Sequence, residues 1–531
     1  MERFSHGRGA GCALAFALAA GASQAAEDLL ADLASGTPEI VETEGGALQG
    51  YAVDGASSFL GIPFAAPPTG ELRWRPPADP EPWEGVRDAG AFGGSCVQTN
   101  TYGVFATPST NEDCLYLNVF TPPAEERSEL KPVMVWIHGG GLVNGRANDF
   151  DGRKLVRDGD VVVVTPNYRL NTFGYFAHPA LDGQGEPFGN YGTMDQQAAL
   201  AWVQRNIEAF GGDPENVTLF GESAGGLATL FNMVSPPAER LFHKAILQSG
   251  VSASLQTPLD EAEAYGVEVA EALGCGDQAE AATCMRAKSV EEIIAAGPFT
   301  NRSTRIVDGT ILPGQLQELI AAGEFHRVPI LLGNNRDEWT WFISLAELAS
   351  GEPITEEGYV ESYVGTYGPD NAARIAEEYP LEDYASPSEA AAAAGTSRNF
   401  VCPSERIMAS AAEHVPVYVY EFMDTEAPIY FPEVTFPYGA AHTLEIQYLF
   451  PLYHGAAGEP RPLSENQEQL SDAMVAYWTN FARAGDPNGE GLPEWPRWSP
   501  EDPQIQLLDA PETTTAAGSG MDRKCDFWNA L

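Results

Sequence analysis

From about residue 40, the chain alternates short apolar segments with longer stretches of helical periodicity. This alternation is typical of a mostly parallel sheet flanked by helices. Five segments are rich in β-branched residues and have the length of buried strands: residues 132–138, 161–165, 217–220, 328–332 and 415–422. Helical periodicity runs through 193–209 and 467–484. No repeat or long low-complexity linker intervenes, so the sequence predicts an α/β fold with a large, mostly parallel central sheet in a single large domain.

The charge of the chain narrows the range of partners. Its 531 residues include 75 acidic and 29 basic side chains, a formal charge of −46. A disordered acidic protein is not expected, since 44% of the residues are hydrophobic. Repulsion from phosphate excludes nucleic acid as a partner and disfavours anionic membranes. The alanine-rich stretch 390–394 is expected to be an exposed helix.

The N-terminus has the features of an export signal. Arg3 and Arg8 precede an apolar run at 12–20, and small residues at Ser23 and Ala25 suit cleavage. The run is about half the roughly 20 residues that a membrane-spanning helix needs. We therefore predict a signal peptide at 1–25 and a domain at 26–531. The mature protein is expected to be periplasmic or secreted, without stable membrane insertion, and its oligomeric state stays open.

The cysteines agree with export. Cys12 leaves with the signal peptide, and an even number remains, as expected for disulfides in an exported chain. Two pairs are close in sequence, which favours Cys96–Cys114 and Cys275–Cys284 and leaves Cys402 with Cys525. A zinc site is disfavoured because no CxxC or HxxxH spacing is present. No metal and no organic cofactor is expected.

A nucleophilic serine is predicted after the strand at 217–220. The sequence continues Gly221-Glu222-Ser223-Ala224-Gly225 and then becomes helical. A GxSxG pentapeptide alone is weak evidence, but between a strand and a helix it forms a sharp turn that lifts the serine hydroxyl above the sheet.

A second glycine-rich segment follows the strand at 132–138. His138 is followed by Gly139, Gly140 and Gly141, whose backbone N–H groups can point into a cavity that no side chain fills. Together with the N–H of Ala224, such groups can bind the oxyanion of an acyl-transfer intermediate. A phosphate-binding loop is the alternative, but neither GxxxxGK[ST] nor GxGxxG with a downstream acid is present.

An activated serine needs a base and an orienting carboxylate. In folds with this elbow the chain order is serine, acid, histidine. Asp337 and Glu338 follow the strand at 328–332, and the residues alone do not decide between them. His442 follows the strand at 415–422 through a loop, the position of the base. His414 and His454 are less well placed and are expected to be structural.

The chain resembles the type-B carboxylesterase and cholinesterase-like family, an α/β-hydrolase family, over nearly all of residues 40–531. The matching segments include FLGIPFAAPPTGELRWRPP (59–77), EDCLYLNV (112–119), HGGG (138–141), NYRL (167–170), the elbow region (189–220 onward) and CDFWNAL (525–531).

The resemblance implies a serine carboxylesterase that hydrolyses small-molecule esters through an acyl-enzyme. By position it makes Ser223 the nucleophile, Glu338 the acid and His442 the base. It places the oxyanion donors at Gly140, Gly141 and Ala224, and it implies the same disulfides as above. A supporting polar network would contain Glu222, Ser249 and Glu445, and two structural ion pairs would join Arg73 with Glu112 and Arg169 with Asp195.

Two departures concern the substrate. The loop 97–113 carries Tyr102 and Phe105 but lacks the tryptophan of choline-binding relatives, so choline esters are not expected to be preferred. Arg302 and Arg305 fall near the expected acyl pocket, which suggests a polar or anionic acyl group, with solvated surface arginines as the alternative. A non-enzymatic binding protein on this fold is disfavoured because every position of the serine, acid and histidine is filled.

Overall fold

The computed structural model describes residues 24–531 apart from 106, 183–184, 253–254, 298–304, 456 and 519–522. The predicted signal peptide at 1–25 therefore falls almost wholly outside the described residues. Within the described part of the chain, no helix combines the length and apolar character needed to cross a membrane.

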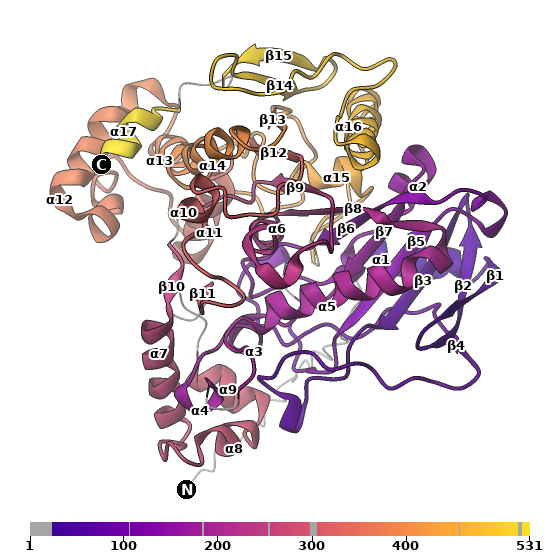
Figure 1. The fold of residues 1–531 in the computed structure, drawn as a ribbon. Coiled ribbons are helices and arrows are strands. Elements are labelled where there is room, and N and C mark those ends of the chain that lie inside the picture. Colours follow the sequence, from indigo (N-terminus) through magenta and orange to yellow (C-terminus); the bar gives the residue numbers. More distant parts are fainter. Residues whose placement is uncertain are drawn as a thin grey trace, which may run out of the picture.

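One large sheet forms the centre of the molecule (Figure 1). Its order among the described residues is β1-β2-β3-β5-β7-β6-β8-β9-β12-β13-β14-β15, with β4 paired to β2. The strands are β1 (Thr37–Thr43), β2 (Gly46–Val53), β3 (Ala56–Pro63), β4 (Val86–Asp88), β5 (Tyr116–Thr121), β6 (Lys131–Ile137), β7 (Val162–Pro166), β8 (Gly212–Glu222), β9 (Lys244–Gln248), β12 (Ile330–Asn335), β13 (Val417–Phe422), β14 (Gln504–Leu508) and β15 (Thr514–Ala517). A separate parallel pair is formed by β10 (Thr257–Pro258) and β11 (Ile306–Val307).

The centre of the sheet is parallel, from β7 through β6, β8, β9, β12 and β13 to β14. Antiparallel strands extend it at both ends, with β1, β2, β3 and β5 on one side and β15 on the other. The predicted mostly parallel sheet is confirmed, and all five predicted strands are present with boundaries shifted by a few residues.

Helices cover both faces of this sheet (Figure 1). They are α1 (Gln24–Leu33), α2 (Arg153–Gly159), α3 (Asn171–Gly174), α4 (Pro179–Asp182), α5 (Tyr191–Asn206), α6 (Ala224–Val234), α7 (Leu259–Ala272), α8 (Ala281–Arg286), α9 (Val290–Ala296), α10 (Leu316–Ala321), α11 (Thr340–Ser350), α12 (Glu361–Glu378), α13 (Pro387–Thr396), α14 (Cys402–Ala412), α15 (Ile446–Leu449), α16 (Glu465–Ala484) and α17 (Cys525–Ala530).

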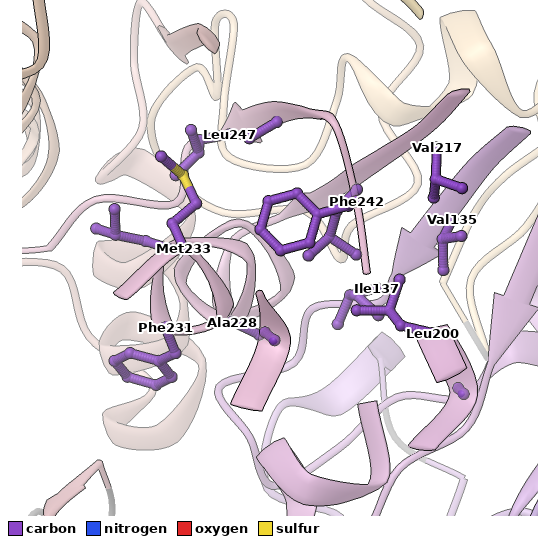
Figure 2. Close-up of a cluster of buried hydrophobic side chains, with 14 of the residues drawn as sticks. Val135, Ile137, Leu200, Val217, Ala228, Phe231, Met233, Phe242 and Leu247 are labelled. Atoms are coloured by element: carbon purple, nitrogen blue, oxygen red, sulfur yellow. The ribbon is translucent and has the colours of Figure 1, made fainter. Parts of the chain in front are cut away.

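Strand β6 shows how one strand serves two cores. Val133, Val135 and Ile137 face the core made with α5, α6, α10 and α14, part of which Figure 2 shows. Met134 and Trp136 point to the other face and pack with α1, α2 and α16. Successive side chains of a strand alternate between faces, so a central strand covered on both sides is apolar at every position.

The prediction for residues 390–394 is partly wrong. A helix is present, α13, but it is not exposed: Ala390, Ala391, Ala392 and Ala394 are buried. Ala390, Ala391 and Ala394 pack with Tyr363, Tyr379, Cys402 and Trp528 in a satellite core. Small side chains allow close packing against large aromatic rings, so a run of alanines is compatible with either environment.

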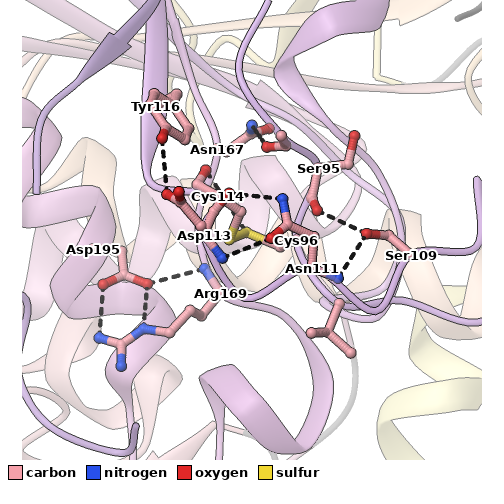
Figure 3. Close-up of a disulfide and its surroundings, with 12 residues drawn as sticks. Ser95, Cys96, Ser109, Asn111, Asp113, Cys114, Tyr116, Asn167, Arg169 and Asp195 are labelled. Carbon is pink, nitrogen blue, oxygen red and sulfur yellow. Dashed lines mark hydrogen bonds and ion pairs between the residues drawn. A yellow bond between two sulfur atoms is a disulfide. The ribbon is translucent and has the colours of Figure 1, made fainter. Parts of the chain in front are cut away.

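The three predicted disulfides are present, joining Cys96 to Cys114, Cys275 to Cys284 and Cys402 to Cys525. The two predicted ion pairs also form. The guanidinium of Arg73 lies 2.5 Å from Glu112, and that of Arg169 lies 2.8 Å from the buried Asp195 (Figure 3). Both pairs join segments distant in sequence around the first disulfide loop, as expected for structural contacts.

Candidate active site

Ser223 occupies a sharp turn between β8 and α6. Its backbone has φ 55° and ψ −123°, a region that L-residues adopt only when the surroundings impose it. Its N–H donates to the Gln248 carbonyl at 2.9 Å, which ties the turn to β9. A Cβ at Gly221 or Gly225 would lie 2.4 Å or 1.8 Å from the Ile137 carbonyl oxygen, so both flanking positions require glycine.

The structure brings His442 and Glu338 to this serine. His442 Nε2 lies 2.8 Å from Ser223 Oγ, and His442 Nδ1 lies 2.5 Å from Glu338 Oε2. The other carboxylate oxygen of Glu338 accepts the Asn335 N–H at 2.8 Å, which orients the acid from the end of β12. The serine thus contacts the imidazole, and the imidazole contacts a buried carboxylate. This is the geometry of an activated nucleophile.

The neighbouring acid has a different position. Asp337 Oδ2 accepts the Ala440 N–H at 3.0 Å, and Asp337 and Ala441 form an isolated bridge. Asp337 thus holds the loop that carries the histidine, while Glu338 contacts the imidazole. Burial raises the pKa of Asp337, although Arg336 opposes this shift.

Gly140, Gly141 and Ala224, the predicted oxyanion donors, line the same cavity as Ser223. Gly140 and Gly141 have φ values of 95° and 65°, which glycine adopts without strain. A Cβ at Gly139 would lie 3.1 Å from the Ser223 Cβ, so the glycine segment packs directly against the elbow. No hydrogen bond between described residues uses the amides of Gly140, Gly141 or Ala224, which leaves them available to an oxyanion.

Glu222, Ser249 and Glu445, the predicted supporting residues, differ in what their side chains contact. Glu222 Oε1 lies 3.3 Å from His442 Nε2, and Glu445 accepts from Asn335 Nδ2 at 2.7 Å and from Gln248 Nε2 at 3.2 Å. Ser249 Oγ is buried without a hydrogen-bond partner among the described residues. Burial and neighbouring carboxylates raise the pKa of Glu222 well above its ordinary value.

The stability of this network depends on pH through Glu445. Burial, then the Glu338 carboxylate, raise the pKa of Glu445 from 4.5 to about 7. Between these values the folded state binds more protons than the unfolded state, so stability falls as pH rises. Glutamine does not titrate, so Glu445→Gln should not show this fall in stability. We expect its free energy of unfolding, relative to that of wild type, to rise by about 2 kcal/mol between about pH 5 and pH 8. Denaturant unfolding at a series of pH values measures the difference; parallel curves for the two proteins would contradict the shift.

A cavity of about 360 Å³ opens above the serine. Tyr102 and Phe105 from the first disulfide loop line it, and Trp339, Trp341 and Phe342 do so as well. The rings of Trp341 and His442 stack with centroids 6.0 Å apart. The tryptophan missing from the disulfide loop is therefore matched by tryptophans after β12. We still predict that choline esters are not preferred substrates. However, the absence of tryptophan on which this prediction was based holds for the loop 97–113 and not for the cavity wall.

The sequence contained one signal for these missed residues. Trp339 and Trp341 follow Glu338 closely, so they had to lie at the same strand end as the acid. Of the two arginines noted near the acyl pocket, Arg302 lies outside the described residues. Arg305 lines the cavity.

Comparisons with known proteins agree with this fold. The profile of the carboxylesterase family matches residues 37–528. An acylcarnitine hydrolase of Mus musculus is 37% identical over 520 residues, covering 92% of this chain and 90% of the relative. A cocaine esterase of Homo sapiens is 36% identical and covers 89% and 87%. The solved structure of a thermophilic PNB esterase has a TM-score of 0.76 at 32% identity, covering 90% of this chain and 98% of that one.

The fold is that of an α/β-hydrolase esterase, with its serine at a strand–helix elbow. The chain belongs to the carboxylesterase family and is a carboxylic ester hydrolase.

Proposed function

We propose that the protein is an exported serine carboxylesterase that hydrolyses small-molecule esters to acid and alcohol through an acyl-enzyme. The observation that carries the proposal is the chain of contacts from Ser223 Oγ to His442 Nε2 at 2.8 Å and from His442 Nδ1 to Glu338 at 2.5 Å. Such a chain makes a weakly acidic hydroxyl nucleophilic at neutral pH.

In the acylation step, Ser223 Oγ attacks the ester carbonyl carbon while His442 Nε2 accepts the hydroxyl proton. The negative charge develops on the carbonyl oxygen, where the N–H groups of Gly140, Gly141 and Ala224 donate to it. Glu338 stabilises the imidazolium that forms. The C–O bond to the alcohol then breaks, and His442 protonates the departing oxygen.

In the deacylation step, the same histidine accepts a proton from water, and the hydroxide attacks the acyl carbon bound to Ser223. The acid leaves, and the proton returns from His442 to the serine oxygen. Glu222 and Glu445 act as positioning residues, because Glu222 reaches the imidazole of His442 and Glu445 binds Asn335, whose N–H holds Glu338. Ser249 stays a proposed supporting residue, and its hydroxyl has no partner among the described residues.

Export is part of the proposal. The predicted signal peptide at 1–25 and three disulfides support a periplasmic or secreted protein, since such bonds persist in oxidising compartments. N-terminal sequencing of the exported protein tests it: a mature chain starting close to residue 26 is expected, and retention of residues 1–25 in the cytoplasm would contradict it.

Labelling with a fluorophosphonate ester tests the function, because only an activated serine reacts with this reagent. We expect one label per molecule, located on the tryptic peptide that contains Ser223. Prior heat denaturation is the control and should abolish labelling. A native protein that remains unlabelled would contradict an activated Ser223.

A further inference from the structure

Arg305 is a cation in the wall of the cavity above Ser223. It directly precedes β11, and its Nε and Nη1 atoms are shielded from solvent without a hydrogen-bond partner among the described residues. The alternative of a solvated surface arginine is therefore contradicted for Arg305. Buried guanidinium donors without acceptors lower the stability of a folded protein, unless a ligand accepts their hydrogen bonds.

The backbone around Arg305 is held on both sides. Its carbonyl accepts the Thr257 N–H at 3.0 Å, and the next residue, Ile306, donates its N–H to Asn190 Oδ1 at 3.1 Å. Asn190 Nδ2 in turn donates to the Ile306 carbonyl at 2.7 Å. Arg305 itself has φ 56°, a left-handed value that is unfavourable for arginine. These contacts impose the conformation, as is common at ligand-binding positions.

Arg305 has no carboxylate partner among the described residues, unlike most of the buried arginines. Five of the six buried arginines form ion pairs: Arg73 with Glu112, Arg146 with Asp149, Arg153 with Asp151, Arg169 with Asp195 and Arg523 with Glu421. The sixth, Arg286, donates to the backbone carbonyls of Arg73 and Trp74. A chain with 75 acidic side chains could readily supply a sixth partner. Instead, the groups that interact with the Arg305 charge are the phenols of Tyr102 and Tyr175.

Two other basic residues in the cavity wall, Arg146 and His138, are not expected to bind an anionic substrate in place of Arg305. Arg146 is ion-paired with Asp149, with Nε 2.9 Å from its carboxylate. Burial lowers the pKa of His138 to about 4, so that this ring is neutral at pH 7. Burial also lowers the pKa of Arg305, but a guanidinium is so weakly acidic that it remains charged at neutral pH.

The side chain of Tyr102 interacts with both Arg305 and the predicted oxyanion segment. Tyr102 interacts electrostatically with Arg305 and also lies against the oxyanion segment, since a Cβ at Gly141 would meet its ring at 2.6 Å. Arg305, Gly140 and Gly141 line the same cavity, so an anion held by Arg305 would share that cavity with the reacting carbonyl.

We propose that Arg305 binds a carboxylate carried by the substrate, so that the enzyme prefers esters with an anionic group near the scissile bond. This inference rests on the proposed esterase function and names the substrate class of the same site. A guanidinium matches a carboxylate in shape and can donate two parallel hydrogen bonds to it. Water is displaced from the cavity when an ester binds, which strengthens the charge interaction.

Matched pairs of esters test the proposal. In the acyl series, mono-p-nitrophenyl glutarate is compared with its methyl-capped diester; in the alcohol series, 4-acetoxybenzoate is compared with its methyl ester. Each pair differs in one negative charge at nearly equal size. The measured quantity is the ratio of kcat/KM for the anionic member to that for the neutral member, with kcat and KM determined separately.

The proteins compared are wild type, Arg305→Gln, Arg305→Lys and Arg461→Gln. Arg461 is exposed and absent from the cavity wall, so its variant controls for the loss of one positive charge from the whole molecule. Fluorophosphonate labelling counts the folded sites in every preparation, so that a poorly folded variant is not mistaken for an inactive one.

We expect wild type to give a ratio above one in at least one series. Arg305→Gln should lower that ratio by about 10- to 100-fold, mainly through KM; Arg305→Lys should restore part of it, and Arg461→Gln should leave it within about twofold. The series affected shows which half of the ester carries the anion.

Two results would overturn the inference, provided that labelling and hydrolysis of neutral esters persist. One is a kcat/KM ratio below one for wild type in both series, and the other is an equal fall of that ratio in Arg305→Gln and Arg461→Gln. Absence of both labelling and hydrolysis in wild type would instead overturn the proposed function itself.

Discussion

Replacing Ser223 by alanine is expected to lower kcat/KM for a p-nitrophenyl ester by about 10⁴- to 10⁶-fold. The change removes the oxygen that attacks the ester, while the oxyanion amides and the cavity remain for weak residual catalysis. Folding should be preserved, because no described hydrogen bond other than the 2.8 Å contact with His442 depends on the Ser223 hydroxyl. Steady-state hydrolysis together with thermal unfolding checks both halves of this expectation.

Ser249→Ala is the matched control for that variant. Ser249 is also buried in the cavity wall, and its hydroxyl has no partner among the described residues, so the same chemical change is made close to the site. We expect its kcat/KM to stay within about tenfold of wild type. Hydrolysis by Ser223→Ala above about 1% of the wild-type rate, after exclusion of contaminating enzyme, would contradict the assignment of the nucleophile.

The second large effect is expected from Glu338→Gln. An amide in place of the carboxylate can accept from His442 Nδ1 but cannot stabilise the imidazolium, and it can favour the wrong tautomer. We expect kcat to fall by about 10³- to 10⁴-fold with a small change in KM, as for other orienting carboxylates replaced by amides. Stopped-flow and steady-state kinetics on one ester give both parameters.

Asp337→Asn is the control for this experiment, because it makes the same chemical change one residue away. Asp337 contacts the Ala440 N–H rather than the imidazole, so the expected loss of kcat is below about tenfold, accompanied by some loss of thermal stability. The reverse ranking of the two variants would show that Asp337 is the orienting acid and that the geometry around His442 is different in the active enzyme.

Much of the fold was predictable because the central strands are buried on both faces. Segments such as β6 and β7 are apolar at consecutive positions, which is a strong signal in a single sequence. The antiparallel strands β1 and β15 were missed because most of their side chains are exposed or half-buried, which weakens the apolar signal. Strand β3 was also missed, although nearly all of it is buried. The burial of α13 was missed because alanine packs well in a core and also suits an exposed helix.

The candidate site was predictable wherever backbone geometry demands glycine. The elbow and the HGGG segment carry glycines whose replacement would produce a clash, and such constraints are visible in the sequence. The choice between Asp337 and Glu338 was different: residue type and position alone left it open, family resemblance indicated Glu338, and only coordinates show which carboxylate reaches the imidazole. Trp341 was missed although it follows Glu338 closely, because its place in the cavity wall also depends on how α11 packs over the sheet.

The proposed mechanism requires a covalent acyl group on Ser223, which mass spectrometry can observe directly. The protein is mixed with a p-nitrophenyl ester, quenched in acid within the first turnovers and digested for peptide mapping. We predict a mass increase of one acyl group, confined to the peptide containing Ser223, with p-nitrophenol released in a burst of one equivalent when deacylation limits turnover. Acylation of a different residue during productive turnover would contradict the account.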